Sequence, residues 1–307
     1  MVRYPLVSVV LTTWNRRAEL ELTLYELTKQ EYPNSEVIVV DNHSTDGTVE
    51  MVRERFPQVR LIVMPAPSYG PCESMNIGFA NALGEYILAL DDDSYPVAGG
   101  IEKAISKFLE NPKLAALGFN ITLTDAGVPW DVWPSDVLSH GTAQTGYLVP
   151  WAIGCGVLYR SEVLKEVGYY QAEYYTYGNE IEIGARILNA GYEIRFFPEI
   201  IVHHRLAQGG RKSGRALYFF LRNLIWFNWQ YMPLAEALGN TAFMLGFYLL
   251  RSFRDGHLPY YLRAVCDGLG GVPAHVRRRT PLKPEVLGVV KSNRFLPSLT
   301  RWTDRLW

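Results

Sequence analysis

The segment "EYILALDDDSYP" (residues 85–96) runs from an apolar stretch directly into three aspartates, Asp91, Asp92 and Asp93, and ends at a proline. A short run that is apolar on both alternations is typical of a strand covered on both faces, as in parallel sheets. Clustered carboxylates at the end of such a strand repel one another unless a cation holds them. The segment therefore predicts a buried strand that ends at a divalent cation site, with a solvated acidic turn as the alternative.

Three similar apolar runs precede this segment, and helical spacing of apolar residues separates them. The runs are "LVSVVLT" (6–12), "EVIVVD" (36–41) and "RLIVM" (60–64), and the helices are expected over 16–30, 46–56 and 73–83. Alternating strands and helices predict an α/β fold with a predominantly parallel sheet and right-handed crossovers. In such a sheet the ligand crevice lies outside the carboxyl ends of the strands.

The second part of the chain continues the pattern less regularly. Further strands are expected at "AALGFNI" (115–121) and "GCGVLYR" (154–160), and "EIRFFPEIIVHHR" (193–205) predicts two short strands around Pro198. A helix is expected over about 179–190, ending at Gly191. The sequence shows no internal repeat.

Polar residues collect where the predicted strands end. Thr12 and Thr13 follow the first strand, Asp41 and Asn42 follow the second, and the three aspartates follow the fourth. These residues should meet on one rim of the sheet, although Asp41 and Asn42 alone would also suit a turn and helix cap.

The rim has the ligands of a hard divalent cation. Carboxylate oxygens select Mg²⁺ or Mn²⁺, and Asp91 and Asp93 share a side if the strand geometry continues. His203 and His204 follow another apolar strand. An imidazole can complete the coordination sphere, more readily for Mn²⁺ than for Mg²⁺.

Charge is unevenly distributed along the 307 residues. The whole chain has a net charge of −1, which gives no general attraction to nucleic acid, but residues 205–307 contain 16 Lys and Arg against 5 Asp and Glu. The three cysteines are widely spaced, so no disulfide framework or zinc site is expected. The first residues enter a strand at once without a signal-peptide pattern, which predicts a cytoplasmic protein.

The basic part begins with a glycine-rich loop over 205–215, expected to be mobile and to help neutralise a leaving diphosphate. Two apolar, aromatic stretches follow at 216–233 and 237–253. The charges of Arg222, Glu236 and Arg251 leave uncharged runs too short to span a membrane. We therefore expect a domain over 1–204 and a helical region over 205–307, whose helices pack on the domain, form a homodimer or lie on an anionic membrane, with Arg277, Arg278 and Arg279 contributing.

Six segments in this order resemble the family 2 glycosyltransferases with the GT-A fold, especially their rhamnosyltransferase-like branch. The resemblance covers about residues 6–204. It rests on "VSVVLTTWNR", "EVIVVDNHSTDGT", "MNIGFANALGEYILALDDDSYP", "GCGVLYRSEVLKEVGYY", "YGNEIEIGARILNAGYEIRFFPE" and "HH". It implies an inverting transfer from a nucleoside diphosphate sugar to a glycan or lipid-linked acceptor in cell-surface polysaccharide assembly, with Mn²⁺ or Mg²⁺ as cofactor.

The resemblance also implies residue roles. The implied donor-binding residues are Thr12, Trp14, Asp41, Asn76, Asp91 and Asp92, and the implied metal ligands are Asp93 and His204. The chain departs from the family pattern at two places. Met75 stands where an arginine is common. Asn179, Glu180, Ile181 and Glu182 stand where Glu-Asp-x-Asp is usual, so Glu180 occupies the position of the general base.

Three other functions are weighed against this one. A degenerate glycosyltransferase that only binds nucleotide sugar would explain the change at Asn179 and Glu180. A sugar nucleotidyltransferase needs a glycine-rich loop after the first strand, and "TTWNRR" has no glycine. A dehydrogenase needs a GxGxxG motif there, which is also missing.

Overall fold

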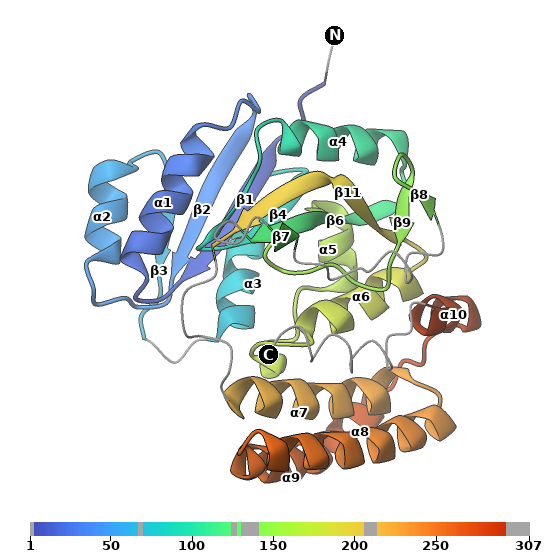
Figure 1. Ribbon diagram of the computed structural model, residues 1–307. Coiled ribbons are helices and arrows are strands. Elements are labelled where there is room, and N and C mark those ends of the chain that lie inside the picture. Colours follow the sequence, from blue (N-terminus) through green and yellow to red (C-terminus); the bar gives the residue numbers. More distant parts are fainter. Residues whose placement is uncertain (1–2, 67–69, 124–127, 130–140, 206–213, 293–307) are drawn as a thin grey trace.

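A mainly parallel sheet lies at the centre of the molecule, as the computed structural model in Figure 1 shows. The structure describes residues 3–66, 70–123, 128–129, 141–205 and 214–292. In spatial order the strands are β3 (Arg60–Val63), β2 (Ser35–Asp41), β1 (Val7–Thr13), β4 (Tyr86–Asp91), β10 (Val157–Arg160), β6 (Leu114–Leu123), β11 (Glu193–His204), β9 (Gly146–Leu148) and β8 (Gly141–Thr142). Two short strands lie off this path: β5 (Ser94–Pro96) pairs with β11, and β7 (Val128–Pro129) pairs with β6.

The sheet is parallel where the sequence predicts it. β3, β2, β1 and β4 are all parallel, and Thr12 at the end of β1 is in register with Asp91 at the end of β4. β10 is antiparallel to both of its neighbours. The predicted α/β fold is confirmed, and the carboxyl ends of β1, β2 and β4 meet at one edge.

Helices cover both faces of the sheet. On one face lie α1 (Arg17–Thr28), α2 (Thr48–Arg55) and α4 (Gly100–Glu110), and on the other lie α3 (Pro71–Asn81), α5 (Ser161–Val167) and α6 (Asn179–Asn189). Alternate residues of β1 join the two cores, Val9 the first and Val10 the second. At Gly78 of α3 a Cβ atom would lie 2.3 Å from Val10 Cγ1, so this glycine lets the helix pack closely on the strand.

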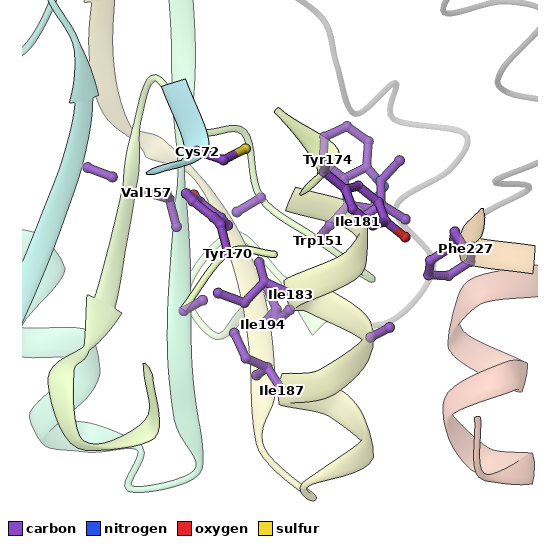
Figure 2. Close-up of a cluster of buried hydrophobic side chains, with 14 of the residues drawn as sticks. Cys72, Trp151, Val157, Tyr170, Tyr174, Ile181, Ile183, Ile187, Ile194 and Phe227 are labelled. Carbon is purple, nitrogen blue, oxygen red and sulfur yellow. The ribbon is translucent and has the colours of Figure 1, made fainter. Parts of the chain in front are cut away.

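Figure 2 shows part of the second core, where α6 packs towards the sheet. Cys72 of α3, Ile183 and Ile187 of α6, and Phe227 from the C-terminal helices belong to the same cluster of buried side chains. The short 3₁₀ helix η1 (Ala172–Tyr174) leads into α6. The helix that carries Glu180 is therefore packed between the sheet and the C-terminal part of the chain.

The two short strands predicted around Pro198 form one strand, β11. Its pairing with β6 shifts in register between Phe197 and Ile201, so the residues between them leave the regular pairing. Pro198 has no N–H to donate, and its carbonyl oxygen accepts a hydrogen bond from Asn120 Nδ2 at 2.9 Å. The prediction of two separate strands was wrong because the chain passes the proline as a bulge and continues in the same direction.

Residues 214–292 form four helices: α7 (Gly214–Tyr231), α8 (Leu234–Arg254), α9 (Leu258–Arg277) and α10 (Pro284–Ser292). Helices within both predicted apolar stretches are thus confirmed. No helix in the described ranges is long and apolar enough to cross a membrane. Most of the predicted basic loop, residues 206–213, lies outside the described residues. The proposed boundary at residue 204 stays a prediction.

Candidate active site

The acidic turn after β4 separates its three carboxylates. The Asp91 side chain is about half exposed, whereas Asp92 and Asp93 are buried. Asp92 Oδ2 accepts a hydrogen bond from Thr13 Oγ1 at 2.8 Å, and Asp92 Oδ1 lies 2.8 Å from Arg16 Nε. The Asp92 side chain is therefore held by the end of β1 and the loop after it, and it does not line the pocket described below.

Arg16 links two of these aspartates, because its Nη2 also donates to Asp93 Oδ2 at 2.6 Å. Burial raises the pKa of Asp92 to about 7, and the Arg16 guanidinium opposes that rise. The backbone of the turn is also held, since the Arg205 N–H donates to the Asp93 carbonyl oxygen and Thr23 Oγ1 donates to that of Asp92. The turn is fixed by contacts from the loop after β1, from α1 and from the end of β11.

His204 reaches the same turn because β5 pairs with β11, which places His204 opposite Ser94. The ring is buried, and its Nε2 lies 2.8 Å from Asp93 Oδ1 and 3.6 Å from Asp91 Oδ2. His203 points elsewhere and packs its ring against Tyr95, with the ring centroids 5.5 Å apart. Of the two adjacent histidines, the structure brings His204 to the aspartates.

The residues around His204 Nε2 fit a divalent cation. Two carboxylates and one imidazole approach a single region, and oxygen ligands with one nitrogen suit Mn²⁺ or Mg²⁺. A cation between Asp91 and Asp93 would also offset the repulsion of their negative charges. The ligand chemistry thus agrees with the cation expected from the sequence.

Glu180 lies at the start of α6 and lines a pocket that opens at the same edge of the sheet. The pocket encloses about 430 Å³, part of it open to solvent. It is lined by residues from β1, α3, β4, the segment before β10, the segment between α5 and α6, and the start of α6: Thr12, Pro71, Cys72, Met75, Asp91, Gly154, Tyr170, Thr176, Asn179 and Glu180. The structure thus brings Glu180 together with Asp91 and Thr12.

The pocket changes the acidity of Glu180. Burial raises the pKa of its carboxyl to about 7, and the negative charge of Asp91 adds to the rise. The Gly154 backbone amide donates a hydrogen bond to the carboxylate and acts against the rise. A Cβ atom on Gly154 would lie 3.0 Å from Glu180 Oε1, so the missing side chain makes room for the carboxylate.

Glu182 has a different environment from Glu180. It is fully buried and forms a salt bridge with Arg186, with 2.7 Å between Oε2 and Nη2. Its Oε1 accepts hydrogen bonds from the Tyr231 hydroxyl at 2.5 Å and from Gln171 Nε2 at 2.7 Å. This carboxylate belongs to a structural network and does not line the pocket.

The segment 173–178 before Glu180 is held by α7. Asn223 is buried, and its Nδ2 contacts the carbonyl oxygens of Tyr174, Thr176 and Tyr177 at 2.6–2.9 Å. Tyr175 and Tyr177 have positive φ angles of 64° and 60°, which L-residues with large side chains rarely adopt. A C-terminal helix therefore holds a strained segment that leads directly to the proposed base.

A second side chain of α7 strengthens this connection. Arg222 Nη2 donates to the carbonyl oxygens of Glu173 and Tyr174 at 2.9 and 3.0 Å. The Tyr175 ring stacks on Phe219 of the same helix, with centroids 4.9 Å apart. Side chains of α7 thus contact both the backbone carbonyl oxygens of the segment and the ring of Tyr175.

The remaining predicted donor-binding residues differ in their surroundings. Asp41 is fully buried, its Oδ2 accepts from the Ser44 N–H at 2.8 Å, and its Oδ1 has no hydrogen-bond partner among the described residues. Trp14 is 52% exposed on the loop after β1. The Asn76 amide is engaged at both ends by the Tyr170 backbone, at 2.7 and 2.9 Å, so its side chain fixes a chain segment rather than facing the pocket.

Several residues at the site did not stand out in the sequence. Arg16 follows the first strand in "TTWNRR", a stretch from which only Thr12, Thr13 and Trp14 were singled out. Cys155 was set aside because it has no cysteine nearby in sequence, yet its Sγ lies close to Asp91 and His204. Asn223 lies more than forty residues after Glu180, so only the folded chain brings them together.

A model of the glycosyl transferase family 2 matches residues 8–168, which is more than half of the chain. The chain belongs to this family. Its matched region includes β1, the acidic turn and Gly154, and ends before α6 and His204.

Individual relatives agree with the family. An "uncharacterized glycosyltransferase" of Haemophilus influenzae is 31% identical over 110 residues, covering 35% of this chain and 44% of that protein. The N-acetylglucosaminyl-diphospho-decaprenol L-rhamnosyltransferase of Mycobacterium tuberculosis is 23% identical over 287 residues, covering 80% of this chain and 93% of that protein. The chain spans about half the length of some curated relatives that it matches, 44% and 51% in two of them.

Solved structures show the same fold. The mannosyltransferase PcManGT from Pyrobaculum calidifontis, solved with GDP-Man and Mn²⁺, has a TM-score of 0.60 at 19% identity, with 99% of this chain and 86% of that chain covered. At this identity the likeness extends to the GT-A-like architecture.

Proposed function

We propose that this protein transfers a sugar from a nucleoside diphosphate sugar to an acceptor hydroxyl with inversion at the anomeric carbon. One observation carries the proposal. The Glu180 carboxyl, with its pKa raised to about 7, lines the same pocket as Asp91, at the carboxyl edge of the sheet beside His204. A general base is most effective when its pKa lies near the working pH.

The donor would bind along the ends of β1, β2 and β4. The unsatisfied Oδ1 of Asp41 can accept an N–H from a nucleobase, because a buried acceptor without a partner is costly and a ligand would satisfy it. Thr12 and Asp91 line the pocket and would contact the sugar part of the nucleoside. Trp14 is exposed beside this position, where its ring can cover a base.

Asp93 and His204, together with Asp91, would hold a divalent cation. When bound, such an ion neutralises charge on the diphosphate leaving group. The protein's own contribution is to keep both ligands in place, Asp93 through Arg16 and His204 through its pairing with β5. Loss of the Asp93 carboxylate in Asp93→Ala should abolish metal-dependent transfer.

Glu180 would remove the proton from the acceptor hydroxyl as that oxygen attacks the anomeric carbon on the face opposite the diphosphate. The carboxylate can do so because it is directed by the Gly154 amide and, within the part of the chain that the structure describes, no arginine forms a salt bridge with it, unlike Glu182. The proton ends on Glu180, the new glycosidic bond replaces the bond to the diphosphate, and the configuration inverts.

The acceptor is proposed to be lipid-linked and presented at an anionic membrane in polysaccharide assembly. The exposed face of α8 supports this, because five large apolar side chains on it are 54–74% exposed: Leu234, Leu238, Phe243, Leu250 and Phe253. Arg277 is exposed on α9, whereas Arg279 donates to the carbonyl oxygens of Trp229 and Met232. An apolar helix face with arginines nearby is typical of helices that lie in a membrane interface.

Co-sedimentation with vesicles of phosphatidylglycerol and phosphatidylcholine at low salt tests this surface. Leu250→Glu should lose vesicle binding. Leu83→Glu should keep it, because Leu83 is equally exposed but lies outside the C-terminal helices. If neither protein binds vesicles and Leu250→Glu instead dissociates a dimer in light scattering, the surface is a homodimer contact and the membrane proposal fails.

The transfer function is tested by donor hydrolysis. A panel of uridine, thymidine and guanosine diphosphate sugars is incubated with Mn²⁺ or Mg²⁺, and the released nucleoside diphosphate is measured for the protein and for Glu180→Gln. Metal-dependent release from one donor that is lost in Glu180→Gln supports the function and identifies the sugar. A protein that binds nucleotide but releases nothing, even with lipid-linked acceptors, would be a binding protein without turnover.

A further inference from the structure

A thiol lies at the edge of the proposed cation site. Cys155 is buried, with 3% of its surface exposed. Its Sγ, one carboxylate oxygen of Asp91 and one ring nitrogen of His204 all lie within 4.8 Å of one another. No other group of three metal-ligating side chains this close together occurs in the described ranges.

Cys155 is adjacent in sequence to a residue that contacts the proposed base. Cys155 follows Gly154, whose backbone amide contacts the Glu180 carboxylate, and it precedes β10, which pairs with β4 just before the acidic turn. It belongs to the core cluster on the α1 face of the sheet, whereas Glu180 lies on the opposite side. Gly154 thus contacts the carboxylate in the pocket, and the next residue, Cys155, lies beside the proposed cation ligands.

The distances are compatible with one ion. Metal bonds of about 2.0–2.3 Å to nitrogen, oxygen and sulfur put two ligands of the same ion roughly 3–4.5 Å apart. The three ligand atoms already lie within 4.8 Å, so only small side-chain movements are needed. Asp93 borders this group, since its Oδ1 lies 2.8 Å from His204 Nε2.

We propose that Cys155 is a ligand of the divalent cation together with Asp91 and His204, and that it gives the site a preference for thiophilic ions. The inference rests on the cation site of the proposed function. Binding converts the thiol to a thiolate, and the proton leaves to solvent. Carboxylates alone favour Mg²⁺ and Mn²⁺, whereas adding a thiolate to an imidazole favours Co²⁺, Zn²⁺ and Cd²⁺.

This combination of metal ligands has a functional consequence. Mg²⁺ and Mn²⁺ bind phosphate oxygens readily and exchange, whereas a Zn²⁺ ion held by sulfur and nitrogen fills its coordination sphere with protein ligands. Zn²⁺ and Cd²⁺ should therefore bind more tightly than Mg²⁺ and inhibit transfer supported by Mg²⁺. Cys155→Ser should retain the carboxylates and imidazole and lose this preference.

The direct experiment is Co²⁺ titration of the full chain, with visible and near-ultraviolet absorption as the readout. Visible d–d bands report that Co²⁺ binds in an ordered site, and a near-ultraviolet thiolate-to-cobalt charge-transfer band reports sulfur coordination. We expect both signals for the unchanged protein. Cys155→Ser and Cys155→Ala should keep Co²⁺ binding but lose the charge-transfer band, and their affinity for Zn²⁺ should fall by about tenfold or more.

Cys266→Ala is the matched control, because it removes an exposed thiol on α9 and leaves Cys155 unchanged. It should keep the charge-transfer band. Circular dichroism and thermal melting of every variant show that it is folded, and two substitutions at position 155 guard against one that does not fold.

The outcomes separate this inference from the function on which it rests. Co²⁺ binding that needs Asp93 and His204 but gives no thiolate band overturns the role of Cys155 and leaves the cation site intact. A thiolate band that remains in Cys155→Ser and disappears in Cys266→Ala also overturns it. If no Co²⁺ binds and donor hydrolysis needs no metal, the cation site and this inference both fail, whereas the base role of Glu180 is still tested by its own variant.

Discussion

Two short segments bring carboxylates to the pocket, the turn 91–93 after β4 and the first turn of α6 at 179–182. Each contains buried acid that is paired with an arginine: Asp92 and Asp93 pair with Arg16 in the first segment, and Glu182 pairs with Arg186 in the second. Each also presents a carboxylate to the pocket, Asp91 and Glu180 respectively. Each segment therefore combines acid that is paired with an arginine and one acid that lines the pocket.

The segments differ in what supports them. The contacts that fix the acidic turn come from the loop after β1, from α1 and from the end of β11, all within the first 205 residues. The segment before Glu180 is held by Asn223, and Glu182 accepts the Tyr231 hydroxyl, both from α7. The comparison teaches that the cation end of the site is built by the sheet, whereas the base end also depends on the C-terminal helices.

The largest expected effect comes from removing the charge of the pocket-facing acid in α6. Glu180→Gln keeps the size of the side chain and removes its ability to accept a proton, so kcat should fall by about 10²- to 10⁴-fold. Nucleotide binding, measured by calorimetry, should be unchanged because Glu180 lies in the acceptor half of the proposed mechanism. A variant with normal kcat would assign the base to another group and end the comparison between the two segments.

The next effect tests the dependence on α7. Asn223→Ala removes the donor from three carbonyl oxygens, two of which belong to residues 174 and 176. The strained segment should then relax and shift Glu180, which lowers kcat by about 10- to 100-fold. The free energy of unfolding should fall by about 1–3 kcal/mol because buried acceptors lose their partner.

Asn228→Ala is the matched control for this substitution. Asn228 is also buried on α7, but its Nδ2 donates to the Leu224 carbonyl oxygen within the helix and does not contact the segment before Glu180. It should lose stability with an unchanged kcat in the protein that remains folded. Equal kcat values for the two variants would show that α7 only stabilises the fold.

The sequence predicted the acidic turn at the edge of the sheet better than it predicted the surroundings of Glu180. The spacing of apolar residues and the alternation of strands and helices were sufficient to predict that Thr12 and Asp91 lie at the same edge of the sheet, because the carboxyl ends of parallel strands meet there. The sequence also predicted that Glu180 lies at the start of a helix. These predictions depend on local spacing and on one topological rule.

The remaining contacts join residues that are far apart in the sequence, so no local sequence pattern predicts them. Nothing in "TTWNRR" says that Arg16 pairs with two aspartates more than seventy residues later, and the Asn223 contacts require the packing of α7. Asp92 and Asn76 were predicted to bind the donor because of their motif positions. The structure uses the Asp92 carboxylate for Arg16 and Thr13, and the Asn76 amide for the Tyr170 backbone.

A smaller effect is expected from pH, and its sign follows from the raised pKa of Glu180. Its carboxyl is protonated below about pH 7, so kcat/KM should fall about tenfold for each unit below that value and level off above it. Asp91 faces the carboxyl and raises its pKa, and the Gly154 amide lowers it. A profile measured with saturating Mn²⁺ that stays flat between pH 5.5 and 8 would contradict the assignment.

The smallest effect on rate is expected at the paired acid of the same helix turn. Glu182→Gln leaves Arg186 buried without its countercharge, so the free energy of unfolding should fall by about 3 kcal/mol. Because Glu182 does not line the pocket, kcat at a temperature where the variant is folded should change little. Denaturant unfolding and steady-state rates measured on the same preparation separate the two quantities. If Glu182→Gln instead lost activity while keeping its stability, the paired acid would take part in the chemistry, and its pairing with Arg186 would not mark a purely structural role.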